Sequence, residues 1–137
     1  MERAFVDTNV VLRFLTGDPP ELAAQAQALF AAVDEGQLCL VLEEIVVAET
    51  VWVLESFYKH APAAICRTLL ELLAHDGIEC RDKARLARAL ALYADRGVDF
   101  ADALLAVSVQ DSAEKVVYSF DRHFDRLVGL RRRIPGD

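Results

Sequence analysis

The sequence contains few of the residues that mark several common kinds of functional site. It has only three cysteines and six glycines among 137 residues. Cys39, Cys66 and Cys80 are odd in number and widely spaced. This fits neither a zinc site nor a disulfide framework, and we interpret them as buried thiols in a reducing cytoplasm. The glycines are too dispersed for a phosphate-binding loop, and no Gly-x-Ser-x-Gly nucleophile motif occurs.

Basic residues are outnumbered by acidic ones, 15 against 22, and long uncharged apolar runs are scarce. The net charge is −7, which argues against nucleic-acid binding through an overall positive field. It leaves a metal enzyme open, because a bound cation inverts the local charge. The longest apolar stretch, "LCLVLEEIVVAETVWVL", carries three glutamates and is a poor membrane span. The N-terminus shows no signal-peptide pattern, so we expect a cytoplasmic protein.

What the sequence does contain indicates one globular domain over residues 1–137. Hydrophobic residues make up 54% and charged residues 27%, enough apolar side chain for a core in a chain of this length. We find no linker, internal repeat or low-complexity segment. His60, His75 and His123 are scattered, and an ordinary surface or capping role is expected for each.

Short apolar runs alternate with segments of helical periodicity. Strands are expected at residues 4–6, 38–42, 78–80 and 115–120, and helices at 9–15, 18–36, 43–58, from Pro62 to before Gly77, 83–97 and 99–112. Thr8 or Asn9 can cap the first helix, which ends at Gly17, and Asp18 can cap the second. This alternation predicts an α/β fold, a three-layer sandwich whose central parallel sheet is flanked by helices.

Asp7 and Asp121 each follow a predicted strand directly. Ligands of parallel sheets tend to bind beyond the carboxyl ends of the strands, so neighbouring strands would bring both carboxylates to one edge. The alternative is that Asp ends strands because it favours turns, and for either residue alone this explanation is about as good. For the two together the functional interpretation is favoured.

Glu49 is the most informative acidic residue by periodicity. At ~100° per residue, the apolar side chains on its side of the helix are those of Ile45, Val46, Trp52 and Val53. The other glutamates of this helix, Glu43, Glu44 and Glu55, fall on the opposite side. A carboxylate buried in an apolar stripe is costly unless it is paired or binds a metal. The alternatives are a stripe edge that reaches water and a buried pair with an arginine.

Asp102 also interrupts an apolar helix face, which is formed by Val98, Leu105, Ala106 and Val109. Here the capping alternative is stronger. Asp99 resembles an N-cap residue, which puts Asp102 at the third helical position, where the helix dipole favours a carboxylate. Asp7, Glu49, Asp102 and Asp121 together form a set of hard oxygen ligands suited to Mg²⁺ or Mn²⁺, which can activate water and stabilise a phosphodiester transition state.

Four segments in order give the chain a family resemblance: "FVDTNVVLRFLTGD", "VVAETVWVL", "VDFADALLAV" and "VYSFDRHFDRL". Together they resemble the PIN-domain ribonucleases, in particular the VapC toxins of toxin–antitoxin pairs. The resemblance implies that Asp7, Glu49, Asp102 and Asp121 hold Mg²⁺ or Mn²⁺. Thr8 and Ser119 match the hydroxyl positions beside the site, with Ser119 where Thr is common, and Asp99 matches an acidic position of part of the family.

The resemblance further implies metal-assisted hydrolysis of RNA that leaves a 5′-phosphate, a homodimer, and silencing by a cognate antitoxin. A mean hydropathy of +0.22 is high for an acidic domain, and we expect a two-fold interface and a groove for an antitoxin helix. Candidate guides for the RNA backbone are Arg13, Arg81, Lys83, Arg85, Arg88, Arg122 and Arg131–Arg133, although each alone is more simply a solvated cation. The alternatives are a non-catalytic PIN scaffold that binds RNA or protein, and a phospho-acceptor receiver domain, which the helical Glu49 disfavours.

Overall fold

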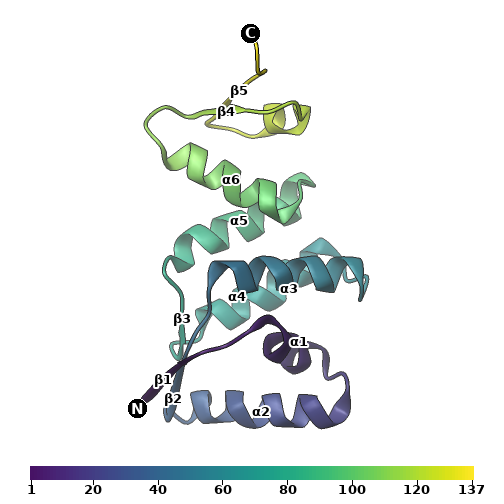
Figure 1. Cartoon of the computed structure of the whole chain (residues 1–137), viewed down its shortest axis with the longest axis vertical. Coiled ribbons are helices and arrows are strands. Elements are labelled where there is room, and N and C mark those ends of the chain that lie inside the picture. The colour runs from purple at the N-terminus through teal and green to yellow at the C-terminus, as the bar shows by residue number, and fades with distance from the viewer. The chain divides into compact units, whose positions relative to one another are not determined.

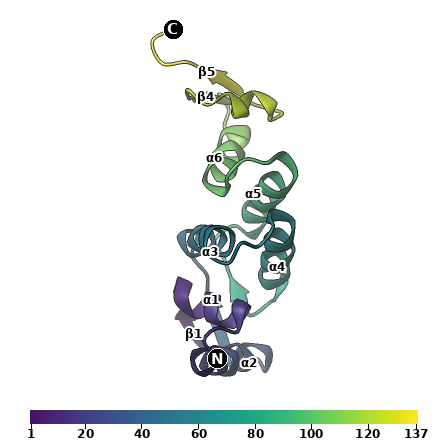
Figure 2. The same cartoon turned by 90° about the vertical axis from the view of Figure 1, so that its right-hand side faces the viewer.

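The computed structural model describes all 137 residues as two compact units, Met1–Lys83 and Ala84–Asp137. Figures 1 and 2 show the order of the elements along the chain. The elements of the N-terminal unit are β1 (Glu2–Phe5), α1 (Thr8–Thr16), α2 (Pro20–Asp34), β2 (Leu38–Val41), α3 (Glu44–Ser56), α4 (Pro62–Ala74) and β3 (Ile78–Glu79). The following elements are α5 (Lys83–Arg96), α6 (Phe100–Asp111), β4 (Val116–Tyr118), the 3-10 helix η1 (Arg122–Arg126) and β5 (Arg131–Arg133).

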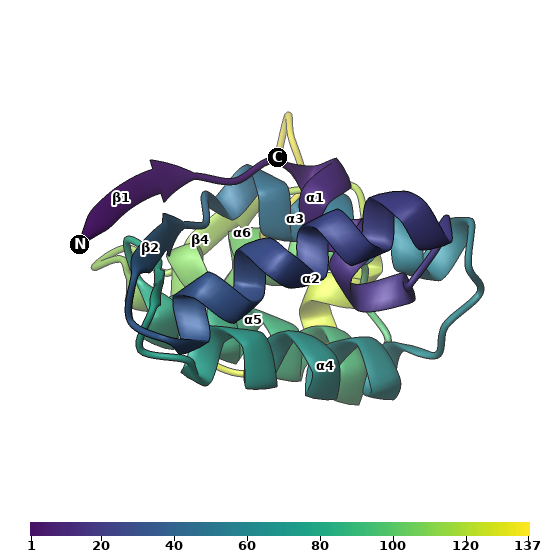
Figure 3. The same ribbon diagram turned by 90° about the horizontal axis from the view of Figure 1, so that it is seen from below.

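The N-terminal unit is built on a parallel sheet with the strand order β1-β2-β3. Parallel neighbours need long crossovers, and each crossover here consists of two helices. α1 contacts both α2 and α3, and α3 contacts α4 (Figure 3). The core between sheet and helices is aliphatic: Leu40, Leu54, Ile65, Leu69 and Ile78 are all at most 2% exposed. This apolar packing fixes the carboxyl end of β1, where the first candidate site residue follows.

Capping at the start of this unit differs from expectation. Asp7, and neither Thr8 nor Asn9, is the N-cap of α1, and the helix ends as expected at Gly17, which has a φ of 72°. The N-cap of α2 is Pro19 with no side-chain bond, so the predicted cap at Asp18 is wrong. The carboxylate of Asp18 instead accepts a hydrogen bond from the Tyr58 hydroxyl at 3.1 Å. An interaction that is distant in the sequence therefore replaces the local one.

The C-terminal unit packs α5 and α6 around Ala89, Leu90, Ala103 and Val107, all of which are completely buried. β4 pairs with β5 in parallel. The apolar pattern predicts neither η1 nor β5, and β5 consists of three arginines, Arg131–Arg133. The guanidinium of Arg132 donates to the Asp125 carboxylate at 3.0 Å and to the Ser119 carbonyl at 3.1 Å. This ion pair and the backbone ladder hold an arginine strand in place.

The α/β class with parallel strands is confirmed, but the strands form two sheets where the sequence predicts one. β1 pairs with β2, and β4 pairs with β5, so the strands that precede Asp7 and Asp121 are not hydrogen-bonded neighbours. The interpretation of the cysteines is right only for Cys66, because the other two are half-buried; all three are free thiols. None of the helices combines the length and the apolar character that crossing a bilayer requires.

Candidate metal centre

Asp7 is fixed at the seam between β1 and α1 by the backbone itself. Its own backbone is extended, and its Oδ1 accepts a hydrogen bond from the Val10 amide at 3.1 Å. A carboxylate at this position caps the exposed amides of the helix and is favoured by the helix dipole. The cap engages one oxygen, and the side chain is exposed. The predicted location at the carboxyl end of a strand is therefore correct.

Thr8 connects this seam to Glu49 on α3. The Thr8 hydroxyl donates to Glu49 Oε1 at 2.8 Å, a bond between residues 41 apart in sequence. With Asp7, Asn9 and Trp52, among others, they line a cleft of about 520 Å³ in the N-terminal unit. The structure thus brings together the first two predicted carboxylates and the predicted hydroxyl. We call Asp7, Thr8 and Glu49 the N-terminal acidic group.

Glu49 is not buried, and the sequence argument for it is wrong in this respect. It is exposed, and so are its apolar neighbours Ile45 and Trp52, at 66% and 70%. The buried face of α3 is formed by Val46, Val47, Thr50, Val51 and Leu54. Apolar residues lie nearly all round this helix, so periodicity alone does not decide which stripe faces the core. Glu49 lies on the open side that lines the cleft.

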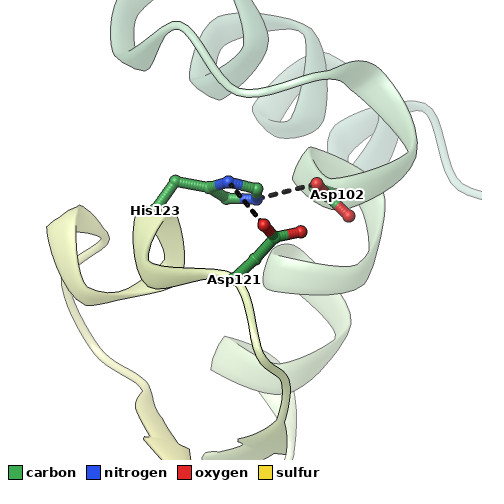
Figure 4. Close-up of side chains that lie close together, drawn as sticks. All are labelled: Asp102, Asp121 and His123. Atoms are coloured by element: carbon green, nitrogen blue, oxygen red, sulfur yellow. Dashed lines mark hydrogen bonds and ion pairs between the residues drawn. The ribbon is translucent and has the colours of Figure 1, made fainter.

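Asp102, Asp121 and His123 come together in the C-terminal unit, and we call them the C-terminal group (Figure 4). His123 Nε2 lies 2.8 Å from Asp102 Oδ2, and His123 Nδ1 lies 3.9 Å from Asp121 Oδ1. One ligand atom from each residue lies within 4.8 Å of the other two. Asp102 is half-buried and Asp121 is exposed. The two carboxylates predicted from the later part of the sequence therefore lie close together.

Two neighbouring residues hold these carboxylates in position. Asp99 is the N-cap of α6 and accepts a hydrogen bond from the Asp102 amide at 2.8 Å, which puts Asp102 in the first turn, as predicted. The Ser119 hydroxyl accepts from the Asp121 amide at 2.9 Å and shapes the turn after β4. A hydroxyl at position 119 thus acts on the backbone of the residue two positions later.

The environment of Asp102 disfavours the charged form of its carboxylate. Partial burial raises the pKa of Asp102, the charge of Asp99 raises it further, and the hydrogen bond from His123 opposes both. Burial of a carboxylate beside other carboxylates disfavours the ionised form. A cation bound among these side chains would remove this penalty. The environment therefore favours a positively charged ligand.

His123 is the member of this group that the sequence does not identify. It lies in the 3-10 helix η1, two residues after Asp121. The apolar pattern of the sequence does not predict this helix. The expectation of an ordinary surface or capping role does not anticipate the half-buried position of His123 or its pairing with Asp102. It is right for His75, the C-cap residue of α4, whose ring lies 2.6 Å from Asp34. His60 is exposed.

The donor set fits a divalent metal ion. Each unit offers carboxylate oxygens beside a hydroxyl, and the C-terminal unit adds an imidazole whose ligand atom lies within 4.8 Å of those of two carboxylates. Oxygen donors of this type suit Mg²⁺ and Mn²⁺, and an imidazole is tolerated by Mn²⁺. No buried side-chain polar atom is left without a hydrogen-bond partner, so these carboxylates are not packing defects.

Several of the candidate RNA-guiding cations already have partners within the protein. Arg88 pairs with Asp111 at 2.8 Å, and Arg85 donates to the Ser108 hydroxyl at 2.6 Å. Lys83 donates to the His75 carbonyl at 3.0 Å. These side chains tie helices together, which supports the simpler interpretation of an ordinary cation for them.

The chain has an α/β fold with parallel strands, and its acidic residues lie at strand ends and helix starts. Comparison with known proteins identifies the protein family. Residues 4–130 match the PIN domain, so the chain belongs to the PIN domain family. The matched region contains every candidate ligand and extends through both units. Among curated proteins, the chain is similar to a VapC ribonuclease of Aquifex aeolicus (strain VF5). The two are 30% identical over 122 residues, covering 89% of this chain and 90% of the relative.

Proposed function

We propose that this protein is a divalent-metal-dependent endoribonuclease and the toxin of a toxin–antitoxin pair. It belongs to the PIN domain family, and its similarity to a VapC ribonuclease extends over nearly the full length of both chains. The observation that carries the proposal is that the four acidic residues of the family resemblance lie accessible or half-buried in two compact groups. A packing role would have buried and paired them.

Asp7, Glu49, Asp102 and Asp121 are the residues we propose to hold Mg²⁺ or Mn²⁺ and to be catalytic. A divalent ion in such a site supplies electrostatic stabilisation of the phosphodiester transition state and makes water a stronger nucleophile. The protein contributes preorganised ligands. The N-cap bond fixes Asp7 relative to α1, and the Thr8 hydroxyl fixes Glu49.

In the C-terminal unit, Asp99 and Ser119 take supporting roles. Asp99 fixes the amide of Asp102, and Ser119 fixes the amide of Asp121. Asp99→Asn, which keeps the cap, tests whether Asp99 also binds the metal. We further propose that residues 1–137 form one PIN domain, since the family match runs through both units without a break.

For the RNA backbone we propose the exposed cations near the C-terminal group and at the chain end. Arg122 is exposed and follows Asp121 directly, and Arg131 and Arg133 are the exposed members of β5. Cations of this kind contact phosphates without reading sequence. Their substitution by Gln should weaken RNA binding uniformly across sequences and flatten its salt dependence.

We propose a homodimer and an antitoxin protein as the partners, in the cytoplasm. Support comes from large apolar side chains of the N-terminal unit that remain exposed, among them Trp52 at 70% and Phe57 at 72%. Clusters of exposed apolar side chains commonly mark protein interaction surfaces. Light scattering at micromolar concentration tests the dimer, and a monomer there would count against it. Growth arrest on expression, relieved by the product of a small adjacent reading frame, tests the toxin role.

The central test is cleavage of labelled RNA by the purified protein in EDTA, Mg²⁺ and Mn²⁺. We expect cleavage only with metal, and products that a 5′-phosphate-dependent exonuclease degrades. Asp7→Asn and Asp121→Asn should each reduce cleavage at least 100-fold. Asp76→Asn is a matched control, because Asp76 is an exposed aspartate outside both groups. RNA binding without turnover in any metal would favour the non-catalytic scaffold instead.

A further inference from the structure

The His123 imidazole lies between two of the proposed metal ligands. In Figure 4 the ring, carried by η1, points toward Asp102 on α6, and the Asp121 side chain lies beside it. Its two nitrogens are 2.8 Å from Asp102 Oδ2 and 3.9 Å from Asp121 Oδ1. Only 23% of its side chain is exposed, and the contact with Asp102 orients the ring. Phe124, the next residue, is buried at 2% exposure and anchors η1.

The spacing of these atoms is close to what one small divalent ion requires. Ligands of an octahedral ion at about 2.1 Å stand roughly 3 Å apart when adjacent and roughly 4.2 Å apart when opposite. The three atoms of the C-terminal group all lie within 4.8 Å of one another. One nitrogen of the imidazole and one oxygen of each carboxylate are therefore close enough together to bind a single ion.

No lysine or arginine takes the place of such an ion beside Asp102. The charges that act on its carboxylate come from Asp99, His123 and Asp121. The nearby guanidinium of Arg132 is engaged with Asp125 and the Ser119 carbonyl. A lysine or arginine would block metal binding, whereas neutral imidazole is a common metal ligand. The chain contains no other group of three such side chains that comes as close.

We infer that His123 is a direct nitrogen ligand of the proposed metal, beside Asp102 and Asp121. The inference rests on the proposed function, because it assigns a ligand to that same metal centre. An imidazole binds Mn²⁺ more readily than Mg²⁺, which prefers oxygen donors and its own water shell. His123→Gln should therefore lower the affinity for Mn²⁺ about tenfold or more and change Mg²⁺ affinity much less.

The test is pulsed electron paramagnetic resonance of Mn²⁺ bound to the full-length protein, which detects ¹⁴N coupled directly to the ion. We expect ¹⁴N modulation in the wild type and in His75→Gln, the matched control that removes the other His–Asp pair. We expect its loss in His123→Gln, with Mn²⁺ still bound at higher concentration. The wild-type spectrum decides the question even if the variant folds poorly.

Three results would overturn the inference. Bound Mn²⁺ without ¹⁴N modulation in the wild type would make His123 a hydrogen-bond donor to Asp102, and the metal-dependent nuclease would stand. Modulation that persists in His123→Gln would assign the nitrogen to another residue. Absence of Mn²⁺ binding together with metal-independent RNA cleavage would remove both this inference and the proposed function.

Discussion

Asp7→Asn separates the two roles that the structure gives Asp7. The Asp7 carboxylate caps α1 through its bond from the Val10 amide, and we propose that it also binds metal. Asn is as good an N-cap as Asp, so this variant keeps the cap and removes the charge. Asp7→Ala removes both and is the matched comparison. The assay is thermal unfolding of the three proteins in EDTA and in Mn²⁺.

In EDTA, the free energy of unfolding of Asp7→Asn should equal that of the wild type or exceed it by up to about 0.5 kcal/mol, because the residue is exposed and the cap remains. Asp7→Ala should lose about 1 kcal/mol. At a free Mn²⁺ concentration of about 100 times Kd, the wild type should gain about 2.7 kcal/mol. For a chain of this length that corresponds to roughly 10 °C in Tm. If the variants bind 100-fold more weakly, about 0.4 kcal/mol of this gain remains.

The reasoning is refuted if Asp7→Asn retains the full Mn²⁺-dependent shift and cleaves RNA normally. Equal losses for Asp7→Asn and Asp7→Ala in EDTA would contradict the capping argument separately. Asp76→Asn should show the wild-type shift, which controls for a general effect of removing one negative charge.

Three further predictions follow from other contacts. Asp99→Ala should lower the free energy of unfolding by about 1 kcal/mol because it removes the cap of α6, whereas Asp99→Asn should keep the cap and the stability. If Asp99→Asn loses the Mn²⁺-dependent shift in Tm, measured in the same melts, Asp99 is a metal ligand. Gly77→Ala should cost about 1–3 kcal/mol in urea unfolding, because its Cβ would overlap sterically with Val33 Cγ1, closer than van der Waals contact allows. Unchanged stability would show that the loop shifts freely. Arg3 holds the pKa of Glu79 at about 2, against an ordinary 4.5. The stability advantage over Glu79→Gln should therefore be full above pH 4.5 and vanish as pH falls toward 2 at low salt, whereas a difference independent of pH would contradict the ion pair.

The order and type of the elements could be predicted because each is set by a local signal. Gly17 ends α1 in a left-handed conformation, and Pro62 opens α4 where a helix lacks partners for its first amides. β5 could not be predicted in this way. Its residues Arg131–Arg133 lack a strand pattern, and what holds them is the ladder with β4 and the bond to Asp125, both distant contacts. Tertiary pairing can override the weak propensity of such a segment.

The structure places Asp7 beside Glu49 and Asp102 beside Asp121, but the burial argument that singles out Glu49 is wrong. Glu49 was placed by an argument from burial, and it is exposed; what holds it is the Thr8 hydroxyl. Asp102 was placed by the same argument and is half-buried, next to a histidine that no spacing rule identifies. Periodicity indicates which face of its own helix a residue occupies, but a functional site is formed by side chains from separate elements. The contacts that define the site therefore cannot be predicted from one segment.

Asp7 and Asp99 also show that capping and metal binding are not competing explanations. Both residues are N-caps, and each cap bond engages only Oδ1, from the Val10 amide in one case and the Asp102 amide in the other. The second oxygen of a capping carboxylate stays available to a ligand. The cap fixes the carboxylate relative to a rigid helix, which lowers the entropy that a metal ion must overcome on binding. A strand end followed by a capped helix is therefore a place where an acidic residue is both stable and preorganised. For this reason a test that removes charge but keeps the cap is more informative than a truncation to alanine.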